Sequence, residues 1–165
     1  MTIGIISDSH DIIENIKKAI EIFNKKKVDL VIHCGDYTYS SSLDLFKKLN
    51  CELKGVLGNC DKNKNEYIKK IKNFELLDRI GKIEIDMRKI AIFHGDNESI
   101  LNSLITSEEF DVVFSGHTHE YLIKNYGKTL HINPGCCCGY KRYTKIKPSI
   151  AIYDTKLHSA EIIKY

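Results

Sequence analysis

Short apolar runs alternate with amphipathic segments through the first half of the chain. Three apolar runs are predicted as buried strands, over residues 3–6, 28–33 and 53–57. Three amphipathic stretches are predicted as helices, over residues 12–26, 43–49 and 66–71. Because strands alternate with helices, this half is expected to form a parallel sheet with helical crossovers.

The second half consists mainly of strands and turns. Alternating apolar positions predict three hairpins, over residues 80–93, 121–133 and 149–164. A helix over 98–106 is expected to lead into the buried run 112–114. A parallel half followed by an antiparallel half indicates an α/β fold in which two sheets pack face to face, with helices outside. No repeat, linker or low-complexity tract interrupts the pattern, so one domain over residues 1–165 is expected.

Composition narrows the functional classes. With 42% hydrophobic and 28% charged residues, the chain is typical of a globular protein. A formal charge of +3 gives no indication of a nucleic-acid partner. No apolar run approaches the length of a membrane span and the N-terminus lacks a signal peptide's basic segment, so we expect a cytoplasmic protein.

Five short polar patterns each follow an apolar run, and together they supply seven side chains of the kind that bind metals. The patterns are Asp8-Ser9-His10, Gly35-Asp36, Gly58-Asn59, His94-Gly95 and Gly116-His117-Thr118-His119. In open α/β sheets, ligands bind beyond the carboxyl ends of the strands, so these side chains are expected to converge. Residues i and i+2 of an extended strand point to the same side, which would pair Asp8 with His10 and His117 with His119.

The chemistry of this set favours a metal centre. Carboxylate, imidazole and amide ligands suit Mn, Fe, Co, Ni or Zn, and the absence of thiolates argues against a structural zinc site. Each pattern taken alone is equally typical of a turn, a helix cap or a strand end. Their occurrence in order, each after a strand, is what predicts a functional site.

In this order the patterns resemble the calcineurin-like metallophosphoesterase superfamily, and most closely its small single-domain bacterial and archaeal phosphodiesterases, relatives of a retromer coat subunit. The resemblance extends to Asn133-Pro134-Gly135. It implies a four-layer αββα sandwich with two mixed β-sheets packed face to face and helices outside. It also implies two divalent metal ions, drawn from Mn, Ni, Fe, Co, Zn and Mg. In that arrangement Asp8, His10 and His119 hold one ion, Asn59, His94 and His117 hold the other, and Asp36 bridges both.

The implied activity is hydrolysis of a small phosphodiester by a hydroxide that bridges the two ions, with Asn59 also contacting the phosphate. An alternative within the same fold is a protein-interaction scaffold with weak or absent catalysis. All seven ligand positions are filled here, which favours the enzyme. A DNA nuclease is disfavoured by the low net charge. The resemblance also makes a homo-oligomer plausible.

Three departures from the family pattern affect the expected chemistry. Many members carry His after the Asn, where this chain has Cys60, so we expect weak activity on monoesters. Cys60 has two open interpretations, a group on the leaving-group side or a small buried filler. Asp96 stands where related proteins often have His. The adjacent thiols of residues 136–138 are expected to be free and to line a loop without a chemical role; the alternative is a thiol cluster that binds a soft metal or becomes oxidised.

The remaining histidines and a basic aromatic segment are expected to have supporting roles. His33 is expected to orient Asp36, whereas His131 and His158 are expected to be structural. Basic and aromatic residues alternate between positions 140 and 147. These are Tyr140, Lys141, Arg142, Tyr143, Lys145 and Lys147. This segment is either a solvated loop or a flap that contacts an anionic substrate.

Overall fold

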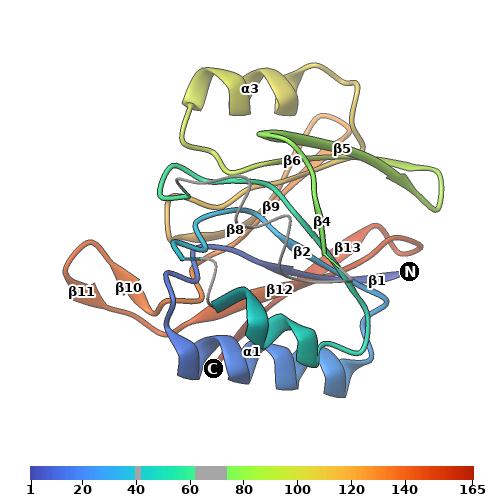
Figure 1. Cartoon of the computed structure of the whole chain (residues 1–165). Coiled ribbons are helices and arrows are strands. Elements are labelled where there is room, and N and C mark those ends of the chain that lie inside the picture. The colour runs from blue at the N-terminus through green and yellow to red at the C-terminus, as the bar shows by residue number, and fades with distance from the viewer. Residues whose placement is uncertain (40–41, 62–73) are drawn as a thin grey trace.

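A computed structural model describes residues 1–39, 42–61 and 74–165 of the chain (Figure 1). Its larger sheet has six strands in the order β13-β12-β1-β2-β3-β4. They are β1 (Thr2–Ile6), β2 (Leu30–His33), β3 (Glu52–Gly55), β4 (Phe74–Leu76), β12 (Ser149–Asp154) and β13 (Ser159–Lys164). The other main sheet has five strands in the order β5-β6-β7-β9-β8. They are β5 (Ile80–Ile85), β6 (Arg88–Phe93), β7 (Val112–Phe114), β8 (Tyr121–Tyr126) and β9 (Thr129–Pro134).

Both sheets are mixed, which confirms the expected sandwich of two mixed sheets. The division of strands between them differs from the prediction, because the final hairpin belongs to the first sheet, where β12 pairs antiparallel with β1. The second sheet in turn contains the parallel pairs β6–β7 and β7–β9. The separation into a parallel half and an antiparallel half was therefore wrong. Strand β12 is buried along five of its six residues, as expected for a strand inside a sheet covered on both faces.

Helices cover the two outer faces of the sandwich (Figure 1). Helix α1 (Ile13–Lys26) and the short helix η1 (Ser42–Lys48) pack on the first sheet through Phe23, Leu43 and Phe46. Helix α3 (Glu98–Thr106) covers the second sheet through Ile105. Between the sheets lies a separate buried cluster, in which the rings of Phe114 and Tyr153 meet edge to face with centroids 5.7 Å apart. These layers place the strand ends in a fixed relation to one another.

Several elements differ from the sequence prediction. The segment predicted as a helix over 43–49 is a 3₁₀ helix, a form common in short connecting pieces. Strand β4 and the hairpin of β10 (Tyr140–Lys141) and β11 (Thr144–Lys145) were not predicted, because each strand has only two or three residues. The helix predicted over 66–71 lies outside the described residues. Among the helices described, none is long and apolar enough to cross a membrane.

His131 on β9 is a buried histidine that should make stability depend on pH. Its Nε2 lies 2.8 Å from the Ser115 hydroxyl, and burial lowers the pKa of His131 from 6.5 to about 4. The folded protein therefore disfavours the charged ring. As the pH falls from about 6.5 to 4, only the unfolded chain takes up this proton. The free energy of unfolding therefore falls by about 3 kcal/mol in total over this range.

We expect His131→Gln to remove most of this acid sensitivity. Urea unfolding in the presence of a chelator, at pH 7 and pH 4.5, measures the free energy of unfolding of both proteins. The wild type should lose about 2 kcal/mol more than the variant over this interval. Equal losses would show that His131 is not held neutral by the fold.

Candidate functional site

The loops that follow β1, β2, β3, β6 and β7 meet at one edge of the sandwich. Backbone hydrogen bonds join them, from the Asp8 N–H to the Gly35 carbonyl at 3.0 Å and from the Gly116 N–H to the His94 carbonyl at 2.8 Å. The loop after β9 joins the same group, because the Cys138 N–H donates to the Asp8 carbonyl at 3.0 Å. The five polar patterns of the sequence are thus brought to a single place.

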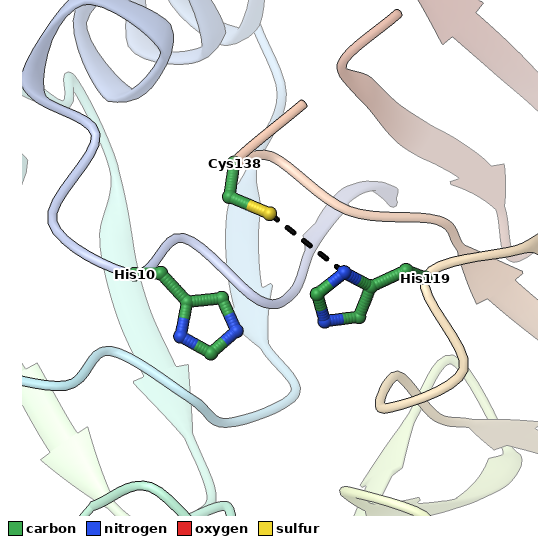
Figure 2. Close-up of side chains that lie close together, drawn as sticks. All are labelled: His10, His119 and Cys138. Carbon is green, nitrogen blue, oxygen red and sulfur yellow. Dashed lines mark hydrogen bonds between the residues drawn. The ribbon is translucent and has the colours of Figure 1, made fainter. Parts of the chain in front are cut away.

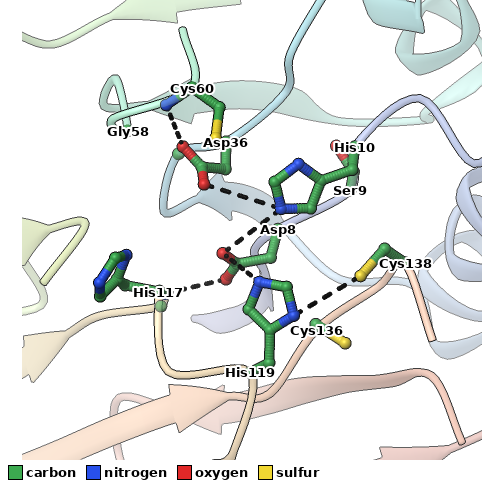
Figure 3. A network of polar contacts seen from close by, with 12 residues as sticks. Asp8, Ser9, His10, Asp36, Gly58, Cys60, His117, His119, Cys136 and Cys138 are labelled. Carbon is green, nitrogen blue, oxygen red and sulfur yellow. Dashed lines mark hydrogen bonds and ion pairs between the residues drawn. The ribbon is translucent and has the colours of Figure 1, made fainter. Parts of the chain in front are cut away.

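Two buried carboxylates, Asp8 and Asp36, lie at the centre of this place (Figure 3). Oδ2 of Asp36 is 3.4 Å from Nε2 of His94 and 3.7 Å from Nε2 of His10. Oδ1 of Asp8 is 3.2 Å from Nε2 of His119 and 3.9 Å from Nε2 of His10. Asp36 therefore faces histidines from both predicted ligand groups, whereas Asp8 faces histidines of one group.

Hydrogen bonds on the far edges of two imidazole rings fix their orientation. Nδ1 of His94 contacts the Cys34 carbonyl at 2.8 Å, and Nδ1 of His119 contacts the Tyr140 carbonyl. A carbonyl oxygen can only accept, so the proton of each neutral ring is on Nδ1. Metal-binding histidines in proteins are oriented in the same way.

In these neutral tautomers, each Nε2 presents a lone pair to oxygen atoms that also carry lone pairs. For His94 these are Oδ2 of Asp36 and Oδ1 of Asn59, the latter at 3.1 Å. Oδ1 of Asp8 is buried and has no hydrogen-bond partner among the described residues. Such facing lone pairs need a proton or a cation between them, and the mixture of oxygen and nitrogen donors suits a divalent cation.

The pKa values of the site residues also indicate a place suited to a cation. Burial alone would raise the pKa of Asp36, but the hydrogen bond and charge of His94 outweigh it and hold that pKa well below its usual range. The close contact with the Asp8 carboxylate, 3.2 Å from Nε2, is the main cause that raises the pKa of His119 to about 11. At neutral pH His119 therefore carries a proton that a metal ion would have to displace.

Asn59 and His117 occupy the exposed rim of the site. The His117 ring packs edge-on against His94, with ring centroids 5.1 Å apart. Its backbone N–H donates to Oδ2 of Asp8 at 3.0 Å. The structure thus brings all seven predicted residues to one edge, with five of them in the buried or half-buried interior of the site.

The backbone differs from the extended conformation on which the pairing of Asp8 with His10 and of His117 with His119 was argued. Five of the seven residues have a left-handed backbone, with φ between 41° and 66°: Asp8, His10, Asp36, His117 and His119. The direction of these side chains is therefore set by turns of the backbone and not by the alternation of an extended strand. A left-handed residue other than glycine costs roughly 1–2 kcal/mol, and such strain concentrates at functional sites.

Asp61 is a site residue that the sequence interpretation missed. Its carboxylate accepts hydrogen bonds from the backbone N–H groups of Asp36, Thr38 and Gly58, at 2.8–2.9 Å. It thereby ties the loop after β2 to the loop after β3. The only sequence signal was its position two residues after Asn59. 

His33 has a different role from the one predicted. Its Nε2 lies 3.0 Å from the Ser9 hydroxyl, and its Nδ1 accepts the Gly35 N–H at 3.1 Å, so it orients the flanking loops and does not hydrogen-bond Asp36. Burial lowers the pKa of His33 to about 3, which keeps the ring neutral.

The thiol of Cys138, in the loop after β9, lies beside the site (Figure 2). Sγ of Cys138 is 3.8 Å from Nδ1 of His119, on the ring edge opposite the one that faces Asp8. Cys136 and Cys138 both donate to the Tyr140 carbonyl, at 3.3 and 3.4 Å. Two of the three thiols therefore contact the carbonyl that orients His119, whereas Cys137 accepts a hydrogen bond from the Tyr165 hydroxyl at 3.3 Å.

Asp96 forms an ion pair, in the position where related proteins often have His. Its Oδ2 is 2.6 Å from Nη2 of Arg79, and Nη1 of Arg79 donates to the Gly58 carbonyl at 3.4 Å. This pair lies beside the loop that carries Asn59.

Comparison with known proteins places the chain among relatives along nearly its whole length. The phosphodiesterase MJ0936 of Methanocaldococcus jannaschii is 43% identical over 159 residues, covering 94% of each chain. The probable metallophosphoesterase YsnB of Bacillus subtilis is 34% identical over 141 residues, covering 82% of this chain and 74% of its own. These identities extend well beyond the five short patterns.

Solved structures agree with the sequence comparison. The structure of an archaeal phosphodiesterase covers all of this chain and all of its own, with a TM-score of 0.92 and 38% identity. A zinc complex of Vps29 from Entamoeba histolytica has the same fold, with a TM-score of 0.74 at 19% identity over 100% of this chain and 98% of its own. The family model of the calcineurin-like phosphoesterase superfamily domain matches residues 1–157. The chain therefore belongs to the calcineurin-like phosphoesterase superfamily.

Proposed function

We propose that this protein is a metal-dependent phosphodiesterase whose site holds two divalent cations. Asp36 is the residue that carries this proposal, because one oxygen of its carboxylate, Oδ2, lies close to Nε2 of both His10 and His94. Asp8, His10 and His119 would hold one cation, and Asn59, His94 and His117 the other. Asp36 would contact both. The relative named as a phosphodiesterase, with 43% identity, supports the same activity.

Different groups of the site would bind the cations, orient the histidines and contact the substrate. Two cations held close together lower the pKa of a water molecule between them and stabilise negative charge on a phosphate. Asp8 and Asp36 would supply the buried negative charge that retains the cations. The carbonyls of Cys34 and Tyr140 hold His94 and His119 in the orientation that binding requires. Asn59, exposed at the rim, can donate its amide to a phosphate oxygen of the substrate.

We propose that Cys60 limits activity on phosphomonoesters. Burial raises the pKa of this thiol to about 11, aided by the charge of Asp36, so the side chain is neutral at pH 7. A neutral thiol cannot offset the second negative charge of a monoester, whereas an imidazolium could. Its backbone N–H, which donates to Asp36 at 2.8 Å, is independent of the side chain.

Cys60→His should therefore raise hydrolysis of p-nitrophenyl phosphate about tenfold relative to bis(p-nitrophenyl) phosphate. Cys60→Ser is the matched control, because it keeps a small neutral side chain and should leave the ratio of the two rates unaltered. If His leaves both rates unaltered, the identity of residue 60 does not set the preference.

The activity itself is tested by removing metal with a chelator and adding Mn²⁺ back. Hydrolysis of bis(p-nitrophenyl) phosphate should be absent after chelation and should return with Mn²⁺. Circular dichroism before and after the treatment shows whether the fold is retained. A folded protein that binds Mn²⁺ without hydrolysing the diester would instead favour an interaction scaffold.

A further inference from the structure

A cavity of about 630 Å³ lies beside His119, and neither of the buried carboxylates Asp8 and Asp36 lines it. His119 lines it together with Glu120, Tyr121 and three lysines, which are Lys141, Lys147 and Lys164. The lysines come from separate parts of the chain, at the end of β10, after β11 and at the end of β13. Positive charge thus converges on one cavity in a protein whose net charge is only +3.

Neighbouring side chains hold two of these ammonium groups in place. Nζ of Lys164 lies 4.1 Å from the centroid of the Tyr121 ring and donates to the Tyr121 hydroxyl at 2.8 Å. Lys141 forms an ion pair with Glu120. With three lysines and one glutamate, the cavity keeps an excess of positive charge. It is therefore suited to an anionic ligand.

The cavity adjoins the candidate metal site through a single residue. Nε2 of His119 faces Asp8, while its Nδ1 contacts the carbonyl of Tyr140, the residue before Lys141. If the phosphate of a diester is bound near Asp8 and Asp36, one of its two organic groups can extend past His119 into the cavity. Lys141 and Lys147 belong to the basic aromatic segment, and their place in the cavity favours its interpretation as a substrate-contacting element.

We infer that this cavity binds a second phosphate group of the substrate, an inference that rests on the proposed phosphodiesterase function. The preferred substrates are then phosphodiesters that carry a further phosphate on one arm, such as a phosphorylated dinucleotide. Lysine ammonium groups bind phosphate as point charges without a fixed bidentate geometry. Tyr121 and Ile146 provide apolar surface for the sugar or base between the two phosphates.

A matched pair of substrates tests this inference. The dinucleotide pdTpdT carries a 5′-phosphate that dTpdT lacks, and otherwise has the same scissile diester. We expect the KM of the wild type to be about tenfold lower for pdTpdT at low salt, with the difference shrinking as ionic strength rises. Lys147→Gln should reduce this preference about threefold, and the double variant Lys147→Gln/Lys164→Gln should abolish it. The control Lys128→Gln, an exposed lysine at the β8–β9 turn, should retain it.

Binding to the metal-free protein separates this inference from the proposed catalysis. Titration with pdTpdT, followed by NMR, should shift the amide signals of Tyr121 and Lys147, whereas dTpdT should shift them much less. These shifts with no hydrolysis of any diester after Mn²⁺ addition would support the anion cavity and overturn the proposed function. Hydrolysis with equal KM values for both dinucleotides, and equal shifts, would overturn the anion cavity alone.

Discussion

Asp36→Asn is expected to reduce metal-dependent diester hydrolysis by roughly a thousandfold or more, the largest effect of any single substitution. The amide removes the negative charge that both proposed cations share. It keeps an oxygen that can accept the Cys60 N–H, a bond of 2.8 Å in the wild type. The loss should therefore come from metal binding, with the fold retained.

Steady-state rates with bis(p-nitrophenyl) phosphate and Mn²⁺, together with Mn²⁺ binding by calorimetry, measure this effect. Asp44→Asn serves as the control, since Asp44 is an exposed carboxylate on η1 that pairs with Lys47. It should retain full activity. Activity of Asp36→Asn within tenfold of the wild type would contradict a shared ligand at this position.

Gly116→Ala is expected to damage both stability and metal binding, because Gly116 lies where two loops touch. A Cβ at this position would lie 1.8 Å from the Ser7 hydroxyl oxygen and 2.7 Å from Oδ2 of Asp8. Ser7 and Asp8 are fully buried, so neither can move into solvent without disturbing the site. We expect a loss of about 2 kcal/mol in the free energy of unfolding, with metal affinity lowered at least about tenfold.

Urea unfolding of the metal-free protein and calorimetric titration with Mn²⁺ test the two parts separately. Gly127→Asn is a suitable control, because nothing lies within 4 Å of a Cβ at Gly127 and Asn tolerates its φ of +58°. That variant should bind Mn²⁺ like the wild type. Unaltered Mn²⁺ affinity in Gly116→Ala would show that the position of Asp8 does not control the site.

Much of the fold could be predicted because its buried strands are short, continuous apolar runs. Apolar runs predict strands β1, β2 and β7 in this way, and one apolar face along residues 12–26 predicts helix α1, which spans Ile13–Lys26. Sheet membership could not be predicted for β12, since the same apolar run fits the centre of either sheet. Pairing with β1 depends on contacts between residues about 150 positions apart, which periodicity does not record.

The site residues were found from their order along the chain, but their local conformation was not. Extended backbone was assumed for the Asp8–His10 and His117–His119 pairs, whereas these residues adopt left-handed turns. Residues other than glycine seldom adopt that conformation, and nothing local in these segments predicts it, so it is imposed by the surrounding loops. The sequence likewise gave no sign that Asp61 would bind three backbone N–H groups, because that role depends on two loops meeting in space.

Two further sets of contacts could not be predicted from the sequence, those of the cysteines at residues 136–138 and those of the lysines that line the cavity beside His119. Cys136 and Cys138 contact the carbonyl that orients His119, although about twenty residues separate them from that histidine. Lys164 reaches Tyr121 across the packed sheets. Such contacts arise because β8 begins near the ends of β10 and β13, an arrangement that no local pattern along the chain encodes.

Anomalous diffraction from crystals of the Mn²⁺-loaded protein tests the central claim most directly. Two peaks should flank Asp36, one bordered by Asp8, His10 and His119 and the other by Asn59, His94 and His117. A single peak, or a peak held by Cys138 and away from Asp36, would contradict the dinuclear site.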